Sequence, residues 1–198
     1  MLSEEQIVKN WERFSSLLLQ TGEHRSGQLQ EMLNHFSDRL IMAPASSKKS
    51  YHGCFVGGLV DHSLRVLKNC TRMAKVAPDV YGSLSEESVV FASLLHDFGK
   101  VGDLTNERYV PQTNNYYKDK GNLFEINKAM PYATVSHMSV FLLQHFGVKA
   151  TWDEWQAILL NDGMVLPENK PYAMFETPLA LLVHQSDRLS CEQEKSLA

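Results

Sequence analysis

Apolar residues recur every three or four positions along most of this chain, and that spacing is typical of amphipathic helices. Between residues 101 and 132 the spacing is lost, and glycine, asparagine and proline surround short aromatic runs. Two of these runs, Tyr109-Val110 and Tyr116-Tyr117, suggest a small β-hairpin. The 198 residues are therefore expected to form an all-α domain of about six or seven helices with one short β excursion.

Start and stop signals divide the periodic segments into separate helices. Capping-box patterns mark two of the starts, at Ser3 with Gln6 and at Thr151 with Glu154. Thr177 is a suitable N-cap for the last helix. The helices are expected to cover residues 3–22, 26–41, 59–77, 85–98, 133–146, 151–160 and 178–189.

Charge and cysteine content narrow the classes of function. Nineteen Lys and Arg against 23 Asp and Glu give a formal net charge of −4, so the chain lacks the overall basic field of duplex-DNA binders, although a nucleic acid could be held locally. Three cysteines without Cys-x-x-Cys spacing argue against a disulfide framework. No apolar run reaches the roughly 18 residues that cross a bilayer, and no secretory leader pattern is present. We therefore expect a cytoplasmic protein that does not enter the membrane.

Histidine and carboxylate side chains lie on the inward stripes of three expected helices. These are His62, the pair His96-Asp97 and Asp187. Taken alone, a buried histidine is more often a hydrogen-bonded core residue, and Asp187 could be a surface acid. A buried carboxylate is costly unless a cation or several hydrogen bonds compensate it, so the joint pattern predicts a metal centre. Nitrogen and oxygen ligands without thiolate suit Mn, Fe, Co, Ni, Mg or Zn.

Two local stretches give this ordered set a family resemblance. Residues 57–63 read Gly-Gly-Leu-Val-Asp-His-Ser, and residues 95–100 read Leu-His-Asp-Phe-Gly-Lys. Together with Asp187, they resemble the HD-domain superfamily of metal-dependent phosphohydrolases over residues 51–190, in particular single-domain phage and bacterial members and the HD domains of some 3′-to-5′ exoribonucleases. The resemblance implies an HD-domain helical bundle. It also implies one domain over residues 1–198, with N-terminal helices in 1–41 and the metal-binding core in 51–190.

The resemblance also implies a ligand set and a reaction. One principal divalent ion is expected to be held by His62, His96, Asp97 and Asp187. Four protein ligands on a roughly octahedral ion leave room for a water and a phosphate oxygen. The expected reaction is therefore hydrolysis of a phosphoester, in a nucleotide or related substrate, by a metal-activated water.

Departures from the family pattern bear on a second ion. Binuclear members have further histidines between the His-Asp pair and the last Asp, and His137 and His145 are the candidates considered for that role here. Some relatives have a histidine before an Asp-Gly step, where this chain has Asn161 before Asp162. We therefore expect a single principal metal site.

Other residues are assigned roles around that ion. Asp97, Lys100 and Asp162 are the expected catalytic residues, with Lys100 or His52 binding a phosphate oxygen and Asp162 accepting a proton. There are non-functional alternatives for each residue. Lys100 could simply interact favourably with the dipole at a helix C-terminus, and His52 and Asp162 could be ordinary solvent-exposed side chains. Base selectivity is expected from aromatic side chains of the insert, namely Tyr116, Tyr117 or Tyr132.

Two other functions stay open. One is a 3′-to-5′ exonuclease or cyclic-oligonucleotide phosphodiesterase, although the acidic net charge favours a mononucleotide substrate. The other is a nucleotide-binding HD domain without turnover, which the departure at Asn161 favours and the intact ligand set opposes. The sequence contains no phosphate-cradling P-loop, Gly-x-Ser-x-Gly elbow or dinucleotide-binding fingerprint.

Overall fold

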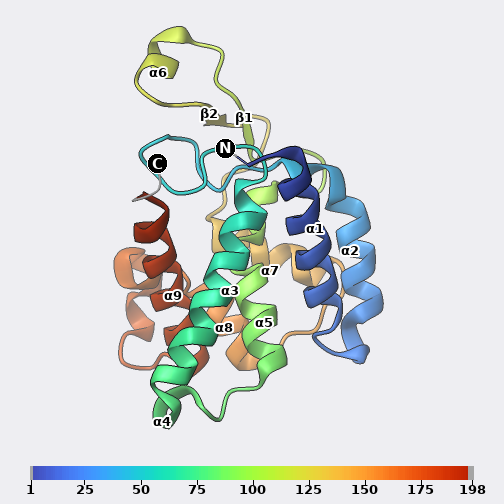
Figure 1. The fold of residues 1–198 in the computed structure, drawn as a ribbon, viewed down its shortest axis with the longest axis vertical. Coiled ribbons are helices and arrows are strands. Elements are labelled where there is room, and N and C mark those ends of the chain that lie inside the picture. The colour runs from blue at the N-terminus through green and yellow to red at the C-terminus, as the bar shows by residue number, and fades with distance from the viewer. Residues whose placement is uncertain (1, 196–198) are drawn as a thin grey trace.

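Seven α-helices of eight or more residues form the body of the described part of the molecule, as the periodicity predicts (Figure 1). The computed structural model describes residues 2–195, so residues 1 and 196–198 of the expected domain lie outside the description. The long helices are α1 (Glu4–Leu19), α2 (Glu23–Met42), α3 (Gly58–Val76), α5 (Glu86–Leu95), α7 (Val135–His145), α8 (Trp152–Leu159) and α9 (Pro178–Lys195). The shorter elements are α4 (Pro78–Tyr81), α6 (Asn115–Asp119), the 3₁₀ turns η1 (Phe98–Val101), η2 (Gly163–Val165) and η3 (Pro167–Tyr172), and the strands β1 (Tyr109–Pro111) and β2 (Phe124–Ile126).

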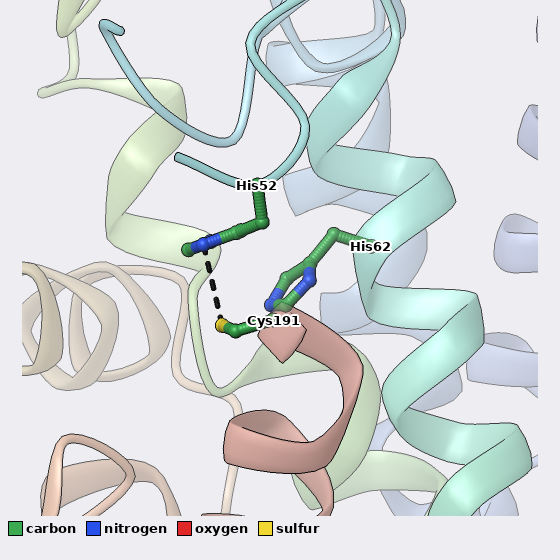
Figure 2. Close-up of side chains that lie close together, drawn as sticks. All are labelled: His52, His62 and Cys191. Atoms are coloured by element: carbon green, nitrogen blue, oxygen red, sulfur yellow. Dashed lines mark hydrogen bonds between the residues drawn. The ribbon is translucent and has the colours of Figure 1, made fainter. Parts of the chain in front are cut away.

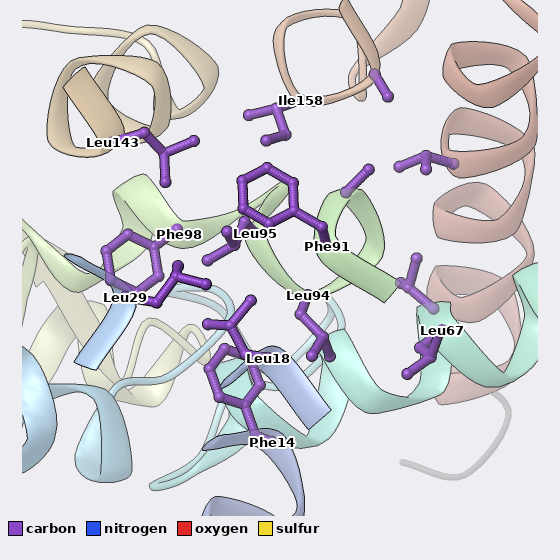
Figure 3. Packing of buried hydrophobic residues seen from close by; sticks show 14 of the residues in the cluster. Phe14, Leu18, Leu29, Leu67, Phe91, Leu94, Leu95, Phe98, Leu143 and Ile158 are labelled. Atoms are coloured by element: carbon purple, nitrogen blue, oxygen red, sulfur yellow. The ribbon is translucent and has the colours of Figure 1, made fainter. Parts of the chain in front are cut away.

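The core lies between α5 and the helices around it. Side chains of α5 and η1 meet α1 and α2 on one side and α7 and α8 on the other (Figure 3). Those fully buried near the centre of this packing are Phe14, Leu18, Leu29, Phe91, Leu94, Leu95, Phe98 and Ile158. Each contributes about 1.5–3 kcal/mol by leaving water. This packing holds α3, α5 and α9 side by side, and these helices carry the predicted ligands.

The predicted hairpin is present, but its second strand lies elsewhere. β1 and β2 pair antiparallel, with Tyr109 opposite Ile126. Tyr116 and Tyr117 belong to the short helix α6 in the connection, so assigning that run to a strand was wrong. The side chain of Asn114 accepts a hydrogen bond from the Tyr116 backbone N–H at 2.9 Å, which caps the helical turn.

Two of the predicted helix ends that differ from the structure bear on the site. The helix expected to reach about Phe98 ends at Leu95, and the chain continues as the 3₁₀ turn η1. The last helix, expected to stop near Leu189, continues to Lys195. The first difference changes the path of the backbone at Lys100, and the second adds nearly two turns to α9.

The predicted caps agree better with the structure. The side chain of Ser3 accepts from the Gln6 N–H, and that of Thr177 accepts from the Ala180 N–H. The full capping box forms at Thr151, as predicted. Within residues 2–195, no helix combines the length and hydrophobicity of a membrane span.

Candidate metal centre

Three helices bring His62, His96 and Asp187 to one buried point. His62 lies near the start of α3, His96 directly follows α5, and Asp187 is on α9. Their potential ligand atoms all lie within 4.8 Å of one another. Asp187 Oδ1 is 3.0 Å from His62 Nε2 and 3.8 Å from His96 Nε2. The structure therefore assembles three of the four predicted ligands into one cluster.

The fourth predicted ligand, Asp97, lies at the edge of this cluster. Its Oδ2 is 3.6 Å from His62 Nε2 and 3.5 Å from His96 Nε2. Lys100 Nζ lies 2.5 Å from the same oxygen, and Asn161 Nδ2 donates to Oδ1 at 3.4 Å. Although burial opposes ionisation, the charge of Lys100 holds the pKa of Asp97 well below its usual range. Asp97 is thus an ionised carboxylate fixed from two sides.

Hydrogen bonds fix the tautomer of both imidazoles. His62 Nδ1 donates to Glu194 Oε1 at 2.9 Å, and His96 Nδ1 donates to the Ser93 carbonyl at 2.8 Å. Each ring therefore turns its Nε2 lone pair toward the cluster. Both Nε2 atoms are buried and lack a hydrogen-bond partner among the described residues. Two free imidazole lone pairs beside ionised carboxylates suit a divalent cation, because it would satisfy all of them.

The local electrostatics also favour a cation. Burial lowers the pKa of His62, but the carboxylates of Asp187 and Glu194 outweigh it and raise the pKa to about 9. Burial likewise opposes ionisation of Asp187, yet the close contact of its Oδ1 with His62 Nε2 lowers its pKa to about 2. The cluster therefore has a strong affinity for positive charge at His62 Nε2, whether a proton or a metal ion supplies it.

His52 and Lys100, two of the residues with expected roles around the ion, lie beside this cluster. His52 extends from its loop toward Cys191 on α9, next to His62 (Figure 2). Its Nε2 accepts from Lys100 Nζ at 3.3 Å, so its Nδ1 carries the proton and donates to Cys191 Sγ at 3.2 Å. Burial and the charge of Lys100 lower the pKa of His52 to about 3, which keeps the ring neutral. His52, His62 and Cys191 form a second group of potential ligands that shares His62 with the first.

Asp162 lies close enough to the cluster for the charged side chains there to shift its pKa. It directly follows the buried Asn161. Desolvation of its carboxylate and the negative charge of Asp97 raise the pKa of Asp162 above its usual value. A carboxylate with a raised pKa is a better proton acceptor than an ordinary one.

The remaining sequence candidates lie away from the cluster. His137 is exposed and bonded to Thr134, and the exposed His145 packs its ring against Phe146. Among the described residues, neither belongs to a group of potential ligands. Tyr116 and Tyr117 lie on α6 at the tip of the excursion (Figure 1), and Tyr132 is 97% exposed.

Sequence reasoning missed Glu194 and Cys191. Both lie on the turns of α9 beyond the predicted end of that helix. Asp187, Cys191 and Glu194 are spaced four and three residues apart, so they share one helix face. Extending the helical period past Leu189 would have placed all three toward the core.

Two glycines of the local stretches allow close backbone packing. A Cβ at Gly99 would lie 2.2 Å from the Val135 carbonyl oxygen of α7. A Cβ at Gly58 would lie 2.0 Å from the Gly53 carbonyl oxygen, in the loop that carries His52. Glycine is thus needed to seat η1 and this loop against the bundle, which positions Lys100 and His52.

Comparison with known proteins gives one family. A family model described as HD domain matches residues 59–190. The matched range contains the four predicted ligands but not His52, Cys191 or Glu194. No match to this chain was found among solved structures.

Proposed function

The chain belongs to the HD-domain family, and on that premise we propose that it is a metal-dependent phosphohydrolase acting on a phosphoester of a nucleotide or related substrate. The observation that carries the proposal is the pair of buried, unpartnered Nε2 atoms of His62 and His96 beside Asp97 and Asp187. These four side chains are the proposed ligands. When bound, a divalent ion supplies Lewis-acid chemistry, since it lowers the pKa of a water and offsets the charge that develops on phosphorus.

Lys100 has the chemistry of a phosphate-binding residue. Its pKa is raised above the ordinary value because Asp97 outweighs the effect of burial, so the ammonium stays charged. One donor faces Asp97 and another faces His52 Nε2. An ammonium has three donors, which leaves one for a phosphate oxygen. We assign His52 the role of orienting this ammonium at the substrate and Asp162 that of proton acceptor.

We also propose that the whole chain is one domain. Residues of α1 and α2 share a single core with α3 and α5, and they lie outside the range of the family match. Phe14 and Leu29 from these helices are fully buried in that core. Without the N-terminal helices, the apolar face of α5 would be exposed to water.

A substrate panel tests the function directly. Purified protein is assayed with Mn, Co or Ni against nucleoside mono- and triphosphates, cyclic dinucleotides and labelled oligonucleotides. We expect metal-dependent hydrolysis of at least one nucleotide class. Protein that binds no divalent ion and cleaves nothing in the panel would contradict the proposal and favour an HD domain that binds its ligand without turnover.

The bond between Glu194 and His62 gives a prediction that does not require turnover. The negative charge of Glu194 orients His62 and makes it more basic, and Glu194→Gln removes that charge. Loss of such a hydrogen-bond partner of a metal ligand typically lowers metal affinity by about 10–100-fold. We expect a loss of this size in Mn²⁺ or Co²⁺ affinity, measured by competition with a chelator. Glu192→Gln on the exposed side of the same helix is the matched control, and its affinity should equal that of the wild type. Equal affinities for all three proteins would contradict the assigned role of Glu194.

A further inference from the structure

Four lysines and three tyrosines gather on one exposed surface at the excursion. We call it the loop–hairpin surface and define it as residues 48–51 with 114–122. Its basic and aromatic side chains are Lys48, Lys49, Tyr51, Tyr116, Tyr117, Lys118 and Lys120, all exposed. The only acid in these two segments is Asp119. The surface is therefore locally basic, in a chain whose formal net charge is −4.

Backbone contacts hold the two segments side by side. Lys48 and Asn122 form an isolated antiparallel bridge, and the Lys49 N–H donates to the Gly121 carbonyl at 2.8 Å. The Leu123 N–H donates to the Ser47 carbonyl at 3.0 Å. In Figure 1 the excursion with α6 stands out from the end of the bundle, beside the loop that precedes α3. The lysines of both segments thus belong to one continuous surface.

Ammonium groups and aromatic rings are interleaved on this surface. Lys120 Nζ lies 4.2 Å from the ring centroid of Tyr116, and Lys48 Nζ lies 5.7 Å from that of Tyr51. Tyr116 and Tyr117 are 60% and 48% exposed. Their rings are available for stacking, and lysines lie beside them to contact a phosphate backbone. This combination is the one that binds single-stranded nucleic acid, whose bases are free to stack.

A cavity at the foot of the surface can receive a base. It has a volume of about 660 Å³, and its walls include the basic, aromatic and apolar side chains of Lys49, Arg65, Tyr51, Phe55, Leu123 and Phe124 together with the acids Asp61 and Glu194. This volume falls in the range of about 300–1,000 Å³ that small-molecule sites occupy. Mainly apolar, aromatic walls with a lysine beside them suit a planar base attached to a phosphate.

We propose that the loop–hairpin surface binds single-stranded nucleic acid, with phosphates on the lysines and bases on the tyrosines and in the cavity. The same loop continues directly to His52 at the metal centre. From Lys48 to His52 the chain can span at most about 14 Å, so a strand held on the surface can extend to that centre. The binding itself does not depend on hydrolysis, and its test is separate from that of the proposed function.

Fluorescence anisotropy with a labelled single-stranded oligonucleotide of mixed sequence, in EDTA and low salt, tests the surface. For three or four phosphate contacts, the logarithm of affinity should fall with that of salt concentration with a slope of about −2 to −3. The double variant Lys118→Glu, Lys120→Glu should bind at least about tenfold more weakly and give a flatter slope. Lys68→Glu with Lys75→Glu, on the exposed face of α3, makes the same charge change elsewhere and should bind almost as the wild type does.

A second variant separates stacking from charge. Tyr116→Ala with Tyr117→Ala should weaken binding by about tenfold while leaving the salt slope unchanged, because stacking releases no counterions. The proposal is overturned if the wild type does not bind the oligonucleotide or if both lysine variants lose affinity equally. Equal binding of a blunt duplex, or binding to anionic phospholipid vesicles but not to the oligonucleotide, also overturns it. None of these results alters the metal-dependent assay of the proposed function.

Discussion

His96→Ala should lose the proposed divalent metal and the proposed hydrolytic activity while keeping a helical circular dichroism spectrum. His96 turns a buried, unpartnered Nε2 toward Asp187, and removing the ring removes that lone pair. Losing an outer partner of a ligand typically costs about 10–100-fold in affinity or activity. Loss of a proposed ligand should exceed that range, so we expect metal-dependent hydrolysis to fall by more than about a hundredfold.

Metal content and activity are measured on the same preparation. His137→Ala is the control, since His137 is exposed and outside the cluster, and it should retain both properties. His96→Gln fills more of the space and keeps the test informative if the alanine variant does not fold. Wild-type metal content and turnover in either folded His96 variant would contradict the proposed centre.

The helices and the cluster could be predicted because both follow from burial. A stripe with the 3.6-residue period has to face the core, and His62, His96 and Asp187 lie on such stripes. A polar or charged side chain at a buried position costs free energy unless it contacts a partner. The sequence therefore predicted that these side chains meet inside the bundle. The capping box at Thr151 was also predictable, because a cap uses only neighbouring residues.

What the sequence did not reveal depends on contacts between distant segments. α5 stops before the predicted end, and η1 is held against α7 by the bond from the Gly99 N–H to Ser139 Oγ at 2.8 Å. The inward face of the last turns of α9 is recognisable only if the helical period is continued from Asp187. Glu194 on that face has a role only because His62 on α3 donates a hydrogen bond to it. Tyr116 was assigned to a strand because aromatic residues favour strands, whereas the cap at Asn114 favours a helical turn.

The role of Arg25 also depends on a contact between distant segments. Breaking that contact is expected to cause a large loss of stability. The predicted second helix began one residue after it, yet Arg25 is buried and donates to both carboxylate oxygens of Glu154, at 2.7 and 3.0 Å. Glu154→Gln should lower the free energy of unfolding by about 3–5 kcal/mol, because a buried guanidinium loses its counter-charge. In a chain of this size, the melting temperature should fall by about 10 °C.

Thermal and urea unfolding of matched variants check this result. Glu5→Gln makes the same chemical change in the exposed pair of Glu5 with Lys9 and should cost less than about 0.5 kcal/mol. Arg25→Met combined with Glu154→Leu removes both charges, so it should be less destabilising than the sum of its two single changes. If Glu154→Gln costs no more than Glu5→Gln, the buried pair does not stabilise the fold.

The effect of Glu154→Gln should also depend on pH. Although burial raises it, hydrogen bonds from Arg25 lower the pKa of Glu154 below its ordinary value of 4.5 in the folded chain. The unfolded chain therefore takes up a proton at higher pH than the folded chain does, and the pair contributes fully only above about pH 4.5. As the pH falls through the lower, folded value, Glu154 becomes neutral like the Gln that replaces it. The stability difference between wild type and Glu154→Gln should therefore be constant from about pH 5 to 7 and shrink below about pH 4, while that for Glu5→Gln stays small throughout.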